Sequence, residues 1–189
     1  MKRRVFVAIN LPENIRKRLA DYQEKWSEFP VRWTKPKNLH ITLEFLGHIS
    51  DEELVEVSKI TKETAQRNKP FSINLSKICY GPIGKIPPRM IWAVGEKSQE
   101  FTALKNDLQK ALSGSKDLSF SPENRAFYPH ITLARIRQWE FRRIEPEERP
   151  DIEENIGLNF SVDSIEIMES QLKRGGAEYI VLESHQLGE

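Results

Sequence analysis

The chain has 189 residues and carries 29 Lys and Arg against 28 Asp and Glu, so its net charge is +1. This length fits one domain, and the near-zero net charge excludes a protein that coats polyanions by bulk attraction. Cys79 is the single cysteine, which excludes an internal disulfide and a multi-cysteine zinc module and fits a reducing compartment. The apolar run at 5–9 is too short for a signal peptide or a membrane span, so we expect a cytoplasmic protein without membrane contact.

The chain begins with a strand-and-helix pattern. The apolar run at 5–9 predicts a buried strand, and Pro12 then occupies the position that a helix offers to a first-turn proline. One apolar stripe at steps of four, three and four residues indicates that helix: Ile15, Leu19, Tyr22 and Trp26. A connection with two prolines is expected at 28–37, followed by a strand at 38–47.

The rest of the chain continues the alternation of strands and helices. Ser50 and Glu53 form a capping-box pattern, which predicts the start of a second helix. A third helix is indicated by leucines at helical spacing and a closing glycine: Leu104, Leu108, Leu112 and Gly114. Alternating or apolar runs predict strands at 71–75, 90–94, 128–136, 158–169 and 177–184. The stretch 137–157 is charged and is expected to be irregular, and the last two strands read as a β-hairpin.

This order of elements favours one fold class over another. A doubly wound nucleotide-binding fold would place a glycine-rich phosphate turn after a strand, and the sequence contains no such turn. A mixed or antiparallel α+β fold is therefore the expectation.

One tetrapeptide, His-Ile-Thr-Leu, occurs twice, at 40–43 and again 90 residues later at 130–133. Both copies lie in predicted strands, which suggests a duplicated half. Because side chains two apart share one face of a strand, the His and Thr of each copy point one way and the Ile and Leu point the other. If the halves pack about a pseudo-twofold axis, one cleft holds His40, Thr42, His130 and Thr132.

The chemistry of this set is that of acid–base catalysis. Two imidazoles can act as one base and one acid in the same turnover, and two hydroxyls can donate to phosphoryl oxygens. The set has no serine or cysteine nucleophile with an evident triad partner, and too few ligands for a convincing metal site. Two opposed histidines suit an in-line displacement at phosphorus. A single histidine in a strand is more often structural, and the matched placement of two is what favours function.

The two H-x-T-x motifs resemble those of the 2H phosphoesterase superfamily, and in particular the RNA 2',3'-cyclic phosphodiesterases, also called 2'-5' RNA ligases. The resemblance covers nearly the whole chain. It is carried by an opening strand at 4–12, the motif blocks at 38–47 and 125–135, and a closing hairpin that contains Ser170, Gly176 and Tyr179.

The resemblance implies a single domain over 1–189 of the α+β class. It is bilobal and duplicated, with two antiparallel β-sheets that flank a central cleft and helices on the outside. It implies an enzyme without metal or cofactor, expected to be a monomer, that opens the 2',3'-cyclic phosphate end of RNA or a nucleotide to a 2'-phosphate. His40 would be the proton donor to the departing O3', and His130 the proton acceptor from the attacking water. Thr42 and Thr132 would hold the nonbridging oxygens.

Substrate binding is assigned to further residues. The resemblance places Arg135 near the phosphate, although strict alternation from Thr132 would turn it away unless a bulge or a strand end intervenes. The aromatic candidates for base stacking are Trp33, Phe45, Phe127 and Tyr128, and of these Phe127 and Tyr128 are assigned to substrate binding. Phe45 and Trp92 are expected in the core. Strict alternation places Phe45 on the apolar face of its strand, and Trp92 lies in an apolar strand.

Two other functions remain open at this point. Ligation of 2'-5' ends is the same chemistry in reverse and passes through the same transition state, so the sequence does not separate it from hydrolysis. A non-catalytic module that binds RNA or nucleotides could keep the cleft without turnover, although two complete His/Thr motifs argue against it.

Overall fold

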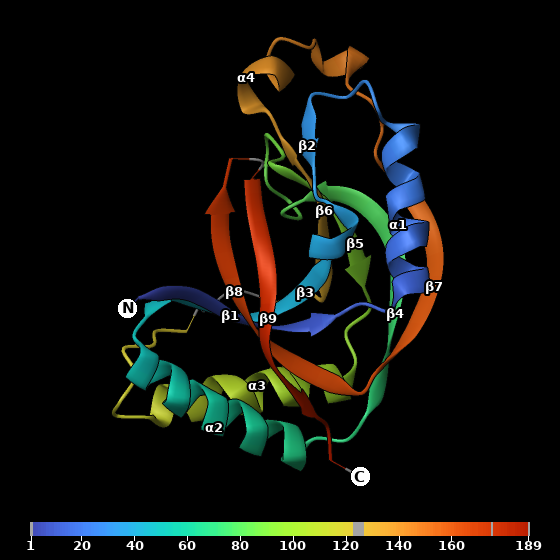
Figure 1. The fold of residues 1–189 in the computed structure, drawn as a ribbon. Helices are drawn as coiled ribbons and strands as arrows, with labels where there is room; N and C mark the ends of the chain where they lie inside the picture. Colours follow the sequence, from blue (N-terminus) through green and yellow to red (C-terminus); the bar gives the residue numbers. More distant parts are fainter. Residues whose placement is uncertain (1, 123–126, 175, 189) are drawn as a thin grey trace.

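The computed structural model describes residues 2–122, 127–174 and 176–188 (Figure 1). Two residues of the second motif block, Arg125 and Ala126, lie outside the described residues. The helices are α1 (Glu13–Lys25), α2 (Asp51–Arg67), α3 (Gln99–Gly114) and α4 (Gln138–Phe141), with 3-10 turns at Pro36–Asn38 and Pro146–Glu148. The strands are β1 (Arg3–Asn10), β2 (Val31–Trp33), β3 (His40–Ile49), β4 (Phe71–Gly81), β5 (Met90–Gly95), β6 (His130–Ile136), β7 (Glu154–Val162), β8 (Ser164–Lys173) and β9 (Gly176–Gln186).

The strands of the described ranges form one antiparallel sheet of nine strands, in the order β7-β4-β5-β6-β3-β1-β8-β9, with β2 paired to β6. The α+β class is confirmed. The prediction of two separate sheets needs correction, because β3 and β6 pair at the centre and join the two groups of strands. That central junction is narrow: the one registered pair between β3 and β6 is Ile41 with Ile131.

Local signals placed most of the elements. Both hydrogen bonds of the capping box form at the start of α2. Ser50 N donates to Glu53 Oε2 at 2.7 Å, and Glu53 N donates to Ser50 Oγ at 3.2 Å. The closing hairpin of β8 and β9 is also as predicted. The strand predicted at 158–169 was wrong, because the chain turns at Asp163 and divides this stretch between β7 and β8. Each half of it pairs with a different partner, β4 on one side and β1 on the other.

Helices cover the apolar face of the sheet. Helix α2 packs against β8 and β9, and α3 packs against β3 and β4, with the two helices side by side (Figure 1). The buried side chains of α3 are the predicted leucine stripe and Phe101, while Ile15 and Leu19 are the buried residues of α1. Ile41, Leu43, Ile131 and Leu133 are at most 2% exposed and belong to this core. Their strand neighbours His40, Thr42, His130 and Thr132 consequently emerge on the opposite face.

Candidate active site

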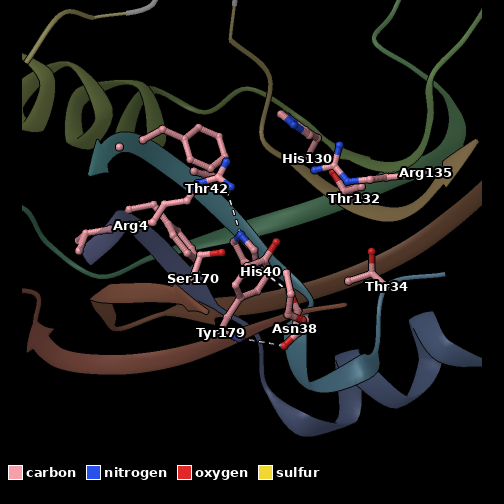
Figure 2. Close-up of a pocket in the computed structure, with 15 residues that line it drawn as sticks. Arg4, Thr34, Asn38, His40, Thr42, His130, Thr132, Arg135, Ser170 and Tyr179 are labelled. Carbon is pink, nitrogen blue, oxygen red and sulfur yellow. Dashed lines mark hydrogen bonds between the residues drawn. The ribbon is translucent and has the colours of Figure 1, made fainter. Parts of the chain in front are cut away.

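The two copies of the repeated tetrapeptide meet in one cleft. A cavity of about 560 Å³ is lined by His40 and Thr42 from β3 and by His130 and Thr132 from β6 (Figure 2). These four side chains, called the His/Thr quartet below, come together because β3 and β6 touch at Ile41 and Ile131, the residues that follow each histidine. The sequence-based expectation of one shared cleft therefore agrees with this geometry.

His40 is held on both ring nitrogens. Its Nδ1 lies 2.7 Å from the carbonyl oxygen of Asn38, and its Nε2 lies 3.0 Å from Thr42 Oγ1. Because a carbonyl can only accept, Nδ1 carries the proton, and the neutral ring leaves a lone pair on Nε2. Phe6 and Tyr179 pack on the ring at centroid distances of 4.9 and 5.1 Å. Burial lowers the pKa of His40 from 6.5 to about 4. The hydrogen bond to the carbonyl of Asn38 opposes this lowering of the pKa, and the charges of His130 and Arg16 add a smaller lowering.

His130 has the equivalent environment in the other half of the site. Its Nδ1 lies 2.8 Å from the carbonyl oxygen of Tyr128, which fixes the same tautomer and leaves Nε2 free for the cleft. The ring stacks on Trp92 with a centroid distance of 3.9 Å and an interplanar angle of 27°. Burial lowers the pKa of His130, and the hydrogen bond to the carbonyl of Tyr128 opposes this lowering. His130 is therefore neutral and basic at neutral pH.

A bulge follows each His-x-Thr motif and changes which side chains reach the cleft. In β6, Thr132 pairs with Trp92 and Ala134 pairs with Ile91, so Leu133 is an extra residue. In β3, Thr42 pairs with Ala8 and Glu44 pairs with Val7, so Leu43 is the equivalent extra residue. Two consecutive residues of each strand are buried at these points. The bulge restores the residue three positions after each Thr to the face of the quartet.

Arg135 and Phe45 are the residues that the bulges bring to the cleft, and both line it. For Arg135 this is the bulge that reconciles its position with the expected contact to phosphate. For Phe45 the expectation of a core position was wrong: its side chain is 62% exposed, because the bulge at Leu43 turns it away from the apolar face.

The charges around the cleft are of one sign. Arg4 and Arg135 line it together with the two histidines, and none of the described lining residues is Asp or Glu. A groove with cationic walls and no carboxylate attracts anions. Among the described residues, no group of three or more His, Cys, Asp or Glu side chains is placed to hold a metal ion.

Comparison with known proteins identifies the family. The sequence model described as LigT like Phosphoesterase matches residues 9–92 and 95–179 of the chain. The chain belongs to the LigT-like phosphoesterases. It is thus an enzyme of the 2H phosphoesterase superfamily, as the motifs predicted.

Individual LigT-like proteins are similar to this chain over most or all of their length. An RNA 2',3'-cyclic phosphodiesterase of Methanothermobacter thermautotrophicus is 30% identical over 179 residues, which is 92% of this chain and 90% of that protein. The crystal structure of TT0787 of Thermus thermophilus superposes with a TM-score of 0.83 at 31% identity and covers 98% of this chain and 99% of that one. E. coli LigT complexed with NADP+ covers both chains fully, with a TM-score of 0.77 at 25% identity.

Two predicted base-binding residues of this LigT-like chain are not among those that line the cleft. The ring of Phe127 stacks on Phe101 of α3 at 5.6 Å and lies under Lys105 Nζ at 4.2 Å, so it is engaged with the helix layer. Tyr128 is 40% exposed, and its ring lies beneath Lys97 Nζ. The contact of Tyr128 with the site is through its carbonyl oxygen, which accepts from His130 Nδ1. Trp92 is buried as predicted, and it also forms the stacking surface for His130.

Several cleft residues carried no functional signal in the sequence reading. Asn38 is buried and bridges to β9, with Nδ2 donating to the carbonyl of Ala177 at 2.8 Å and Oδ1 accepting from Tyr179 N at 3.4 Å. This bridge holds the Tyr179 ring edge-on against His40. Arg4 and Ser170 also line the cleft from β1 and β8. In the sequence, only their positions within the blocks that resemble the family pointed to these residues. Local pattern could not place them at the cleft, because the strands that meet there are distant in sequence.

No helix among the described residues has both the length and the apolar content needed to cross a membrane.

Proposed function

We propose that this LigT-like phosphoesterase hydrolyses RNA 2',3'-cyclic phosphate ends to 2'-phosphates by metal-independent acid–base catalysis with two histidines. The observation that carries the proposal is the matched environment of the His/Thr quartet. Each histidine is fixed through Nδ1 by a backbone carbonyl at 2.7 or 2.8 Å, so that its Nε2 faces the same cleft. A base, an acid and two hydroxyl donors are then available to one phosphate, and every step can be assigned to a side chain of this chain.

The reaction proceeds by in-line attack of water on phosphorus. Nε2 of His130 takes a proton from the water as its oxygen bonds to phosphorus, and the bond from phosphorus to O3' breaks. Nε2 of His40 gives its proton to O3', which leaves a 3'-hydroxyl and a 2'-phosphate monoester. Thr42, Thr132 and Arg135 donate to the nonbridging oxygens, where negative charge grows in the transition state.

The protonation states require an explanation. His130 is ready as a base because burial lowers its pKa. His40, whose pKa is about 4 in the free protein, must gain a proton to act as the acid. The cyclic phosphate is an anion, and an anion beside an imidazole favours the charged form. We therefore expect substrate binding to raise the pKa of His40, so that His40 takes up the proton that it later donates.

The comparisons support both the substrate class and the architecture. The similar protein of Methanothermobacter thermautotrophicus bears the name of this activity, and E. coli LigT forms a complex with a nucleotide, NADP+. The family model matches twice in succession, over 9–92 and 95–179, which supports two duplicated lobes related by a pseudo-twofold axis at the quartet. We also propose that the enzyme acts as a monomer in the cytoplasm.

The test is hydrolysis of adenosine 2',3'-cyclic phosphate by protein treated with excess EDTA. Undiminished turnover is the expected result, since no step is assigned to a metal. Loss of activity with EDTA, restored by a divalent cation, would reject the metal-free mechanism. Binding of the cyclic nucleotide without any turnover would favour the non-catalytic module.

A further inference from the structure

Two consecutive arginines of β1 have opposite environments. Arg3 forms ion pairs with Asp51 at 3.1 Å and with Glu169 at 3.6 Å, on the side of the sheet that carries α2. Arg4 faces the other side, where it lines the cleft, and within the described part of the chain its guanidinium has no hydrogen-bond or ion-pair partner. A guanidinium with five donors and no carboxylate partner at the wall of a cleft is available for a ligand anion.

Arg4 and Arg135 belong to different sides of the site. Arg4 lies on the side of His40 and Ser170, and Arg135 lies on the side of His130 and Thr132 (Figure 2). Their strands, β1 and β6, are separated in the sheet by β3. The cleft thus presents one guanidinium from each group of strands, with the His/Thr quartet between them.

The scissile phosphate does not need both arginines. A cyclic phosphate diester carries one negative charge on two nonbridging oxygens, and Thr42, Thr132 and Arg135 already supply donors for them. An RNA end carries a second monoanion close by, the phosphodiester on the 5' side of the same terminal ribose. A free nucleoside 2',3'-cyclic phosphate lacks that second charge.

We propose that Arg4 binds this 5'-phosphate, so that the enzyme prefers RNA ends and 5'-phosphorylated nucleotides to free nucleoside 2',3'-cyclic phosphates. The inference rests on the proposed function and names the substrate feature that the same cleft selects. Ser170, whose side chain lines the cleft beside Arg4 (Figure 2), is a second donor at this position.

A matched substrate pair isolates the contact. Adenosine 2',3'-cyclic phosphate and its 5'-phosphorylated form differ by the 5'-phosphate alone. Wild-type enzyme should have the higher kcat/KM for the 5'-phosphorylated form, and Arg4→Gln should lower kcat/KM for that substrate by about 10- to 100-fold, the usual worth of a hydrogen-bonded ion contact. Hydrolysis of the substrate without 5'-phosphate should fall far less, because only the general attraction of the cleft for anions is weakened. Arg4→Lys should restore part of the preference, and Arg3→Gln is the control on the adjacent residue that should leave the preference intact.

The salt dependence of kcat/KM separates a contact with phosphate from a structural role, because a structural role for Arg4 would not change it. The logarithm of kcat/KM for the 5'-phosphorylated substrate should fall with the logarithm of salt concentration, and Arg4→Gln should reduce that slope by about 0.7, the value for one contact to single-stranded nucleic acid. An equal loss on both substrates would place Arg4 at the scissile phosphate, and no loss on either would remove it from binding. Both results overturn the proposal.

A binding measurement separates this inference from the proposed function. Calorimetry with adenosine 2'-phosphate and adenosine 2',5'-bisphosphate requires no turnover. The bisphosphate should bind more tightly to wild type, and Arg4→Gln should abolish the difference. Equal affinities in wild type would contradict the 5'-phosphate contact even if the enzyme hydrolyses cyclic phosphates as proposed.

Discussion

His40 and His130 are oriented by the same contact, in which Nδ1 donates to the carbonyl oxygen of the residue two positions earlier, Asn38 at 2.7 Å and Tyr128 at 2.8 Å. The contact sets the tautomer of both rings without any carboxylate, unlike a Ser-His-Asp triad. Its two copies differ in what covers the ring: Phe6 and Tyr179 at His40, and Trp92 at His130. The two imidazoles therefore share geometry and differ in environment, which is what an acid and a base in one site require.

The paired role predicts the effect of removing each ring. His40→Ala and His130→Ala should each lower kcat by about 10²- to 10⁴-fold, the usual contribution of a positioned acid or base. The double variant should lose far less than the product of the two losses, because the rings act as one unit. Steady-state kinetics on a 2',3'-cyclic nucleotide measures this.

His48→Ala is the matched control, since His48 is an exposed histidine on the same strand and does not line the cleft. It should retain full activity. A near-normal rate for either cleft variant, with thermal melts that show an intact fold, would contradict the paired mechanism.

The pH profile follows from the lowered pKa of both histidines. The proposed mechanism requires His40 protonated and His130 neutral, so kcat/KM should be bell-shaped, with limbs that belong to the pair. Since the pKa of His40 is about 4 and that of His130 lies below 6.5, the plateau should lie on the acidic side of neutrality. The alkaline limb of kcat should lie at higher pH than that of kcat/KM, because we expect the bound anion to raise the pKa of His40. Coincident alkaline limbs for kcat and kcat/KM would contradict that rise.

A buried ion pair supports the bulge in β3. Lys105 of α3 binds the carboxylate of Glu44 and donates to the carbonyl of Leu43, the extra residue, at 2.7 Å. The Glu44 side chain is 5% exposed and that of Lys105 is 12% exposed. Lys105→Met should lower the free energy of unfolding by about 3–5 kcal/mol, because it leaves a buried carboxylate unpaired.

The double variant Lys105→Met with Glu44→Leu should recover most of this loss, since an apolar pair can replace a buried ion pair. Urea denaturation of Lys105→Met, Glu44→Leu and the double variant measures the coupling. A single variant within about 0.5 kcal/mol of wild type, the range of ordinary surface substitutions, would mean that the pair does not support the bulge.

Phe45 predicts a substrate effect without a stability effect. The residue is 62% exposed and lines the cleft, with its ring 6.0 Å from the ring of Phe6. Stacking of a base on an exposed aromatic ring contributes about 1–3 kcal/mol, so Phe45→Ala should raise the Kd for adenosine 2'-phosphate by about 5- to 150-fold with little change in Tm. An unchanged Kd would remove Phe45 from base binding, and a large drop in Tm would return it to a packing role.

Local pattern was sufficient for the quartet and insufficient beyond it. Alternation within one strand correctly separated His40 and Thr42 from Ile41, because no irregularity intervenes. It failed for Phe45, since a bulge exists only relative to the partner strand, here Val7 and Ala8 of β1. The position of Arg135 depends on the same non-local information. Strict alternation from Thr132 would point it away from the cleft, and the bulge against β5 brings it to the cleft.

The same limit explains the elements that the sequence did not predict. β2 has three residues in a segment expected to be a connection, and it forms because Val31 and Trp33 pair with Ile136 and Ala134 of β6. The division between β7 and β8 at Asp163 follows from two different partner strands. The two groups of strands join into one sheet through a single registered pair, Ile41 of β3 with Ile131 of β6. No pattern within either strand predicts that pair.

Product identity tests the account most directly. Phosphorus NMR of adenosine 2',3'-cyclic phosphate with EDTA-treated enzyme distinguishes the two possible monoesters. If His40 protonates O3' while His130 activates water, adenosine 2'-phosphate accumulates as the single product. Accumulation of adenosine 3'-phosphate would contradict the assignment of His40 to O3' and of His130 to the attacking water.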